Sequence, residues 1–133
     1  MTFSLRAIAA IFGGRRRPLG QQGEDAAVRA LKKAGYTILE RNVHLGRYEI
    51  DIIAREGDTI AFVEVKTRRV VGDFQPEDNV TDRKQRHVIR AANIYISRKS
   101  DPTVYYRFDI AAGVMPETGK PSVTIYRDAF QAN

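Results

Sequence analysis

The stretch that decides the fold is Glu49-Ile-Asp-Ile-Ile-Ala-Arg-Glu-Gly-Asp-Thr-Ile-Ala-Phe-Val-Glu-Val-Lys66, near the middle of a chain of 133 residues. Apolar residues alternate with charged ones toward both of its ends, which predicts two strands. The polar segment 55–58 between them contains Gly57 and has the length of a hairpin turn. The stretch therefore predicts two antiparallel strands that pair directly.

The charged residues of these two strands are placed to meet. Residues two apart in a strand share a face. Glu49 should therefore lie on the same face as Asp51, and on the second strand Glu64 should lie with Lys66. Closing the hairpin would bring three carboxylates and one ammonium group together, at a cost in repulsion and lost hydration. A bound cation would offset that cost.

The composition is that of one ordinary globular domain. The chain is 43% apolar and 29% charged, and its length suits a single domain. Because it has no cysteine, disulfides and thiolate metal sites are excluded. Its two histidines, His44 and His87, are too few for a typical zinc site and are interpreted as surface residues. A reducing, cytoplasmic location is expected.

Positive charge is concentrated in two places. The net charge is +6, with +4 in residues 1–20 and +5 in residues 66–99, while residues 21–65 and 100–133 are slightly acidic. A basic block directly after the acidic hairpin suits a polyanion whose phosphate lies over a metal site. The alternative is a solvated helix face, which is the usual role of a charge run.

Residues 1–20 are expected to form a flexible basic tail, and residues 21–133 a single domain. The mildly apolar segment 1–12 is too short to cross a bilayer, which takes about 20 apolar residues. The arginine cluster follows this apolar part, the reverse of the order in a secretory signal. No membrane association is therefore expected.

The remaining pattern predicts two helices and five strands. Helices are expected at residues 21–34 and 80–99, where apolar residues recur at helical spacing. Strands are expected at residues 36–43, 48–54, 59–67, 103–114 and 122–127, with a long loop at 68–79. The order α-β-β-β-α-β-β predicts an α/β fold, in which a mixed sheet is flanked by a helix on each side. Arg107 and Asp109 are interpreted as a pair across strands. Tyr36, Tyr48 and Tyr95 are interpreted as packing residues and not as platforms for base stacking.

Asp51 and Glu64 are predicted to supply the donor atoms of a magnesium site. Mg²⁺ takes oxygen ligands and keeps several waters, so two carboxylates on adjacent strands would hold it. Such an ion polarises a phosphodiester and lowers the pKa of its bound water. Lys66 would orient or deprotonate that water, or stabilise the transition state, with Glu49 as an accessory residue. The alternative is a surface Glu–Lys pair, which is common on strands.

Two helix residues are placed to join this site. Glu24 lies in line with the apolar stripe of the first helix and would add a third carboxylate, or it is a first-turn acid favoured by the helix dipole. Lys84 lies where the second helix begins, with Gln85 beside it, and would bind phosphate as a point charge. The alternative for Lys84 is a salt bridge to Asp51 or Glu24.

From about residue 20 to 131 the chain resembles the YraN family of small bacterial proteins. The resemblance rests on the blocks Gly23-Glu24, Gly35-Tyr36, Glu40-Arg41-Asn42, Glu49-Ile50-Asp51, Phe62-Val63-Glu64-Val65-Lys66-Thr67-Arg68, Lys84-Gln85, Arg107-Phe108-Asp109 and Ala129-Phe130. That family is regarded as restriction-endonuclease-like, with a PD-(D/E)xK type of site, and resembles archaeal Holliday-junction resolvases. The resemblance implies that Asp51 and Glu64 are the motif acids, Lys66 the motif lysine and Glu24 the helix acid. The family pattern has Gly before Glu-Ile-Asp, where this chain has Tyr48.

These features together predict an endonuclease that hydrolyses DNA with Mg²⁺ or Mn²⁺, and branched or structured DNA is a candidate substrate. Glu24, Asp51 and Glu64 would bind the ion, and Lys66 would assist the water. The residues expected to bind nucleic acid are Arg68, Arg69, Arg83, Lys84, Arg86 and Arg90. A homodimer would suit the cutting of two strands. The alternatives are a non-catalytic nucleic-acid-binding module of the same fold and an assembly factor that uses the apolar tail.

Overall fold

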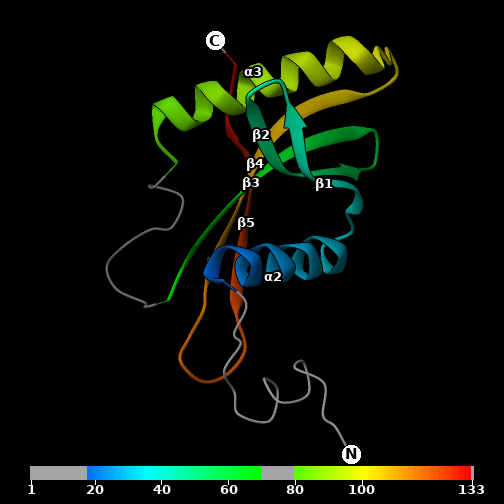
Figure 1. Ribbon diagram of the computed structural model, residues 1–133. Helices are drawn as coiled ribbons and strands as arrows, with labels where there is room; N and C mark the ends of the chain where they lie inside the picture. The colour runs from blue at the N-terminus through cyan, green and yellow to red at the C-terminus, as the bar shows by residue number, and fades with distance from the viewer. Residues whose placement is uncertain (1–17, 70–79, 133) are drawn as a thin grey trace, which may run out of the picture.

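A five-stranded mixed sheet with one helix on each face forms the molecule (Figure 1). The computed structural model describes residues 18–69 and 80–132. The elements in chain order are α2 (Leu19–Lys33), β1 (Thr37–Leu45), β2 (Tyr48–Glu56), β3 (Thr59–Arg68), α3 (Asp82–Lys99), β4 (Tyr105–Val114) and β5 (Ser122–Phe130). The predicted α/β class and the order α-β-β-β-α-β-β are confirmed, and this is the order of a restriction-endonuclease-like domain.

The strands lie side by side in the order of the sequence, β1-β2-β3-β4-β5. All neighbours are antiparallel except β3 and β4, which run parallel. Parallel strands need a crossover connection, and α3 supplies it between β3 and β4. Helix α3 thereby returns across one face of the sheet (Figure 1), and its first turn reaches β3, where Lys84 pairs with Glu64.

Two apolar cores fill the layers on either side of the sheet. The core under α3 contains Phe62, Val88 and Tyr95, and the core under α2 contains Leu31, Ile52 and Val63. On β3, Phe62 packs toward α3 and Val63 toward α2, as strand alternation requires. Both faces of the central strands are covered, which explains their nearly continuous apolar sequence.

The helices begin close to where their sequences predict. Helix α2 starts at Leu19 after Pro18, so residues 19 and 20 belong to the helix and not to the tail. Helix α3 starts at Asp82, and the Thr81 hydroxyl accepts a hydrogen bond of 3.2 Å from the backbone N–H of Lys84. The rest of the expected tail and most of the expected loop 68–79 lie outside the described residues. Among those described, no helix is long and apolar enough to cross a membrane.

Helix α2 lies directly against the end of β3. A Cβ atom added to Gly23 would come within 2.3 Å of the Thr67 Cγ2 atom, so only glycine permits this approach. The contact fixes the start of α2, and with it the neighbouring Glu24, beside the C-terminal end of β3.

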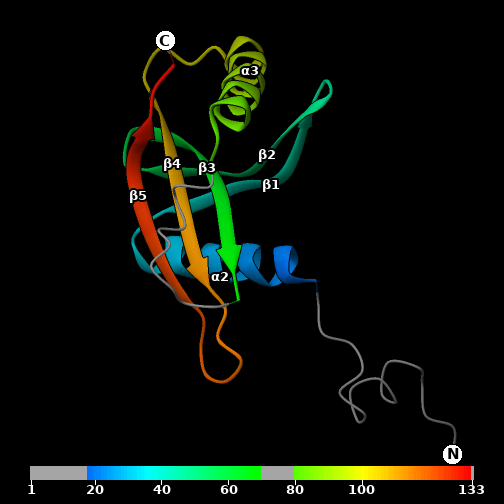
Figure 2. The same ribbon diagram turned by 90° about the vertical axis from the view of Figure 1, so that its left-hand side faces the viewer.

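The side chains of β2 switch between the two faces of the sheet out of turn at Asp51. Its ladder with β3 runs from the Glu56–Thr59 pair to the Ile52–Val63 pair and stops there. Ile50 packs in the core under α3, whereas Ile52 packs in the core under α2, so the period-two alternation breaks between them. The tip of the β1–β2 hairpin bends away from β3 toward α3 (Figure 2). Asp51 therefore stands at a fork between β2 and β3.

Candidate active site

The Asp51 carboxylate occupies the fork between β2 and β3. Its Oδ2 atom accepts a hydrogen bond of 2.9 Å from the backbone N–H of Val65. The backbone hydrogen bonds between β2 and β3 end before this point. The Asp51 side chain therefore accepts from the Val65 N–H in place of a backbone carbonyl of β2. The bond holds the carboxylate beside Glu64, the residue that precedes Val65 on β3.

Glu64 is a buried acid with half of its hydrogen-bonding capacity unused. The residue is 3% exposed, and its Oε1 atom lies 3.0 Å from the Nζ atom of Lys84. Its Oε2 atom is buried and has no hydrogen-bond partner among the described residues. Burial, and then the negative charge of Asp51, raise the pKa of Glu64 to about 8 although Lys84 opposes the shift. Lys84 alone therefore does not offset the cost of burying this carboxylate beside Asp51.

Lys84 is the cation that lies beside Asp51 and Glu64 of the β2–β3 hairpin. Burial works against its charge, but the negative charges of Glu64, Asp51 and Glu49 together hold its pKa above the usual value. The predicted salt bridge of Lys84 is present, but with Glu64 and not with Asp51 or Glu24. About half of the side chain (49%) is exposed, so Lys84 has room to leave Glu64 for another anion.

A cavity of about 380 Å³ opens at these residues. It is lined by Asp51, Glu64, Val65, Lys66, Val80, Thr81 and Lys84. Lys66 is partly buried here, so the lysine of the Glu-Val-Lys triplet borders the same space as the two acids. Gln85 instead donates from its side-chain amide to the Val80 carbonyl at 3.0 Å and braces the start of α3.

Glu24 is buried (9% exposed) but is held by other partners. Its Oε1 atom accepts hydrogen bonds from Arg41 Nε at 2.8 Å and from Asn42 Nδ2 at 3.0 Å. Within residues 18–69 and 80–132, no three His, Cys, Asp or Glu side chains form a group that could hold a metal ion. The structure thus brings Asp51 and Glu64 together and leaves Glu24 outside their group.

The sequence carries one clear family signature. The model of the Uncharacterised protein family UPF0102 matches residues 23–112. The chain belongs to this family. The match confirms the predicted YraN family, and it spans both acids, Lys66 and the site end of α3.

Similar proteins named "UPF0102 protein" occur in several bacteria. One from Caldicellulosiruptor saccharolyticus is 48% identical over 95 residues, which is 71% of this chain and 80% of that protein. One from Chlorobaculum parvum is 44% identical over 108 residues, covering 81% and 84% of the two chains. One from Desulfosudis oleivorans is 44% identical over 118 residues, covering 89% and 94%. Their names state a family and no activity, so function has to be argued from the site.

The arginines expected to bind nucleic acid lie on more than one surface of this UPF0102 chain. Arg83, Arg86 and Arg90 are exposed on α3. Arg83 lines a pocket beside the cavity at Asp51 and Glu64, while Arg86 lines a shallow pocket with Asp82 and Gln131. Arg68 is partly buried at the end of β3, and Arg69 follows it, exposed.

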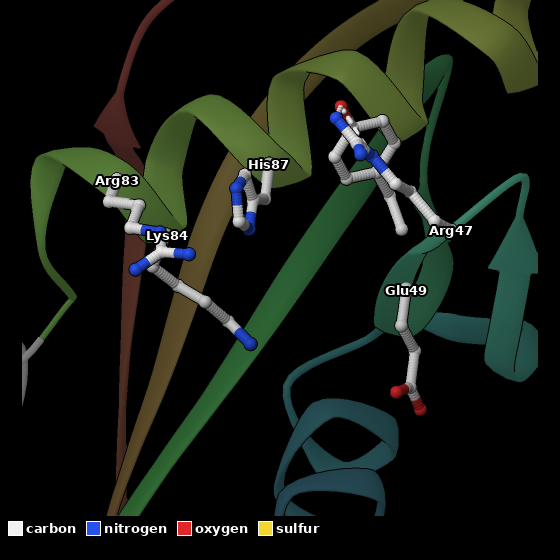
Figure 3. A pocket seen from close by; sticks show the side chains of 6 residues that line it. Arg47, Glu49, Arg83, Lys84 and His87 are labelled. Carbon is white, nitrogen blue, oxygen red and sulfur yellow. Dashed lines mark hydrogen bonds between the residues drawn. The ribbon is translucent and has the colours of Figure 1, made fainter.

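Sequence reasoning missed a second pocket, of about 410 Å³, between the β1–β2 turn and α3. It is lined by Arg47, Tyr48, Glu49, Arg83, Lys84 and His87. Figure 3 shows Lys84 and His87 projecting from α3 toward the strands and Arg47 reaching from the turn toward α3, while Glu49 points away from the helix. The only hint in the sequence was Tyr48, which stands where the family pattern has Gly.

Proposed function

We propose that this protein is a divalent-metal-dependent endonuclease that hydrolyses phosphodiester bonds in DNA. One observation supports this most strongly: the buried Glu64 carboxylate has an oxygen without a partner among the described residues, beside a second carboxylate, at a cavity bordered by two lysines. Buried charges are normally paired and hydrogen-bonded, so this arrangement suits a ligand.

The donor atoms fit Mg²⁺ or Mn²⁺. Asp51 and Glu64 supply carboxylate oxygens only, which are the ligands these ions prefer, and Mg²⁺ usually keeps several waters and binds through one or two carboxylates. When bound, the ion would polarise the phosphodiester and supply an activated water. Glu24 would add a third carboxylate only after exchanging its bonds to Arg41 and Asn42.

The two lysines have separate roles in this proposal. Lys66 borders the cavity and would orient the attacking water or stabilise the charge of the transition state. Lys84 balances Glu64 in the absence of an ion, and its exposed end would then move to a phosphate of the substrate. Branched or otherwise structured DNA is the candidate substrate, and a homodimer would cut both strands.

A binding module of the same fold is the competing proposal. Its support is that Lys84 already offsets the charge of Glu64 and that the described residues contain no group of three metal-binding side chains. In that case the exposed arginines of α3 would carry the affinity, and binding would fall with salt at a slope of about −0.9 per phosphate contacted on duplex DNA.

The test is cleavage of duplex, single-stranded and four-way-junction DNA by the purified protein with Mg²⁺ or Mn²⁺. Asp51→Asn and Lys66→Ala should each lower the rate by about 100-fold or more, because each removes a preorganised charge. Asp51→Asn keeps an oxygen that can accept from Val65, so the fold should persist. The matched controls are Asp58→Asn and Lys120→Ala, which alter exposed residues in the β2–β3 and β4–β5 turns.

Two results would decide against the nuclease. Equal rates for wild type and Asp51→Asn would remove the site from the chemistry. DNA binding without cleavage under every metal, and with no effect of Asp51→Asn, would favour the binding module.

A further inference from the structure

The pocket between the β1–β2 turn and α3 concentrates positive charge. Arg47, Arg83 and Lys84 line it together with His87, and Glu49 is the one carboxylate among its described lining residues. Burial and the charges of Arg83, Arg90, Arg47 and Lys84 lower the pKa of His87. Among its described lining residues, the pocket therefore carries three permanent positive charges against one carboxylate.

Tyr48 holds one cation of this pocket, Arg47, together with Arg90, which lines the neighbouring pocket on α3. Its hydroxyl oxygen accepts a hydrogen bond of 3.0 Å from Arg90 and longer ones of 3.4 Å from Arg47. The guanidinium carbons of Arg47 and Arg90 lie 5.4 and 6.0 Å from the centre of its ring, and the His87 ring centre lies 5.3 Å from it. A tyrosine so surrounded has little ring surface left for stacking on a base, so its role is to position the arginines.

The two arginines that line this pocket, and Arg90 beside Tyr48, form no ion pair in the described part of the chain. The ion pairs there engage Arg41, Lys84, Arg107 and Arg127, and none engages Arg47, Arg83 or Arg90. Like charges held together without a counter-ion repel each other, and a guanidinium fork matches the oxygens of a phosphate. The pocket is therefore a preorganised site for a phosphate group.

We propose that Arg47, Arg90 and Tyr48, with Arg83 and His87 beside them, form a clamp for one backbone phosphate of the DNA substrate. Lys84 lines both this pocket and the active-site cavity, so the clamped phosphate neighbours the one to be cleaved. The clamp fixes the register of the strand over Asp51 and Glu64. This inference rests on the proposed function for its substrate, but not on cleavage.

The clamp is tested by DNA binding in EDTA, where no metal-dependent cleavage occurs. The probe is a short fluorescein-labelled duplex, followed by anisotropy over a range of salt concentrations. Arg47→Ala should weaken binding about fivefold to tenfold and reduce the salt slope by about one, as loss of one phosphate contact predicts. Tyr48→Phe keeps the ring but removes the acceptor, and should weaken binding about twofold to threefold. Arg98→Ala, at the other end of α3, is the matched control and should bind as wild type does.

Duplexes with single neutral methylphosphonates identify the phosphate. One internal position should weaken wild-type binding and have no further effect on Arg47→Ala, which is the pattern of two coupled groups. Coupling to a 5′-terminal phosphate alone would overturn the backbone assignment, and unchanged binding by Arg47→Ala and Tyr48→Phe would overturn the clamp. If wild type cleaves DNA but these variants bind normally, the clamp is wrong and the nuclease stands. If the variants lose affinity but no metal supports cleavage, the clamp stands and the nuclease proposal is wrong.

Discussion

Two polar clusters lie in the same sheet and differ in how their buried carboxylates are satisfied. The Asp109 network consists of Tyr36, Glu56, Arg107, Asp109 and Arg127. The Asp51 cluster consists of Asp51, Glu64 and Lys84. Both contain a deeply buried acid on a central strand, Asp109 on β4 and Glu64 on β3.

The Asp109 network is closed. Its carboxylate accepts from Tyr36 Oη at 2.8 Å, from Arg107 Nε at 2.8 Å and Nη2 at 2.9 Å, and from the backbone N–H of Asp128 at 3.0 Å. Arg107 also reaches Glu56, which Arg127 binds through two nitrogens. Arg107 and Asp109 do pair, but along one strand, because residues two apart share a face; the expected pairing across strands is wrong for these two.

The Asp51 cluster is open by comparison. Glu64 has one cation, half exposed, and one oxygen without a partner in the described residues. A network with every donor and acceptor satisfied stabilises a fold, whereas one that is partly satisfied costs free energy until something binds. This difference is why we interpret the Asp109 network as structural and propose ligand binding for the Asp51 cluster, although both consist of acids and basic side chains.

The same substitution should have opposite consequences in the two clusters, and this is the largest effect we expect. Asp109→Asn leaves Arg107 and Tyr36 facing an amide, and should lower the free energy of unfolding by about 3 kcal/mol. Asp51→Asn keeps its acceptor for Val65 and removes repulsion with Glu64, so stability should stay the same or rise slightly. Urea unfolding of both variants at neutral pH measures this, and equal losses would erase the distinction between the clusters.

Metal binding should separate the clusters next. Mg²⁺ or Mn²⁺ at about 100 times its dissociation constant should raise the free energy of unfolding of the wild type by about 2.7 kcal/mol. The gain should vanish in Asp51→Asn and persist in Asp109→Asn, measured against the metal-free form of each variant. Thermal unfolding with and without metal gives the answer, and Asp58→Asn controls for loss of charge alone. A gain retained in Asp51→Asn would place the ion elsewhere.

The local sequence pattern predicted the strands and helices that carry the Asp51 cluster. Period-two alternation identifies β2 and β3, and helical spacing identifies α2 and α3, because each element buries one periodic face. The hairpin then places Asp51 near Glu64, and helical phasing places Lys84 at the start of α3. These inferences need only the chain's own periodicity.

The remaining details depend on contacts between residues distant in sequence. The alternation of side chains along β2 breaks at Asp51, and no residue type at that position predicts the break. Arg41 and Asn42 hold Glu24 from a neighbouring strand, and the Tyr48 pocket forms only where the β1–β2 turn meets α3. Geometry of this kind is set by packing between elements, which spacing along one element does not encode.

Glu64→Gln should show a smaller effect, whose sign depends on pH. Burial raises the pKa of Glu64 to about 8, above its unfolded value of about 4.3. Between these values the folded protein binds the proton more tightly than the unfolded one, so wild-type stability falls as pH rises through this window. Relative to wild type, the metal-free variant should differ little at pH 4, gain on the order of 2 kcal/mol by pH 6 and gain more by pH 8. Urea unfolding across this pH range measures the difference.

Glu56→Gln is the matched comparison, because Glu56 belongs to the closed network. Hydrogen bonds from Arg127, and then from Arg107, lower the pKa of Glu56 to about 2 despite partial burial. Its contribution to stability is therefore complete above the unfolded value and is lost as pH falls toward 2. Glu56→Gln should destabilise the protein at pH 7 and 8, where Glu64→Gln stabilises it. If both glutamines destabilise the protein at pH 8, Glu64 is satisfied after all, and the case for a bound cation beside Asp51 fails with it.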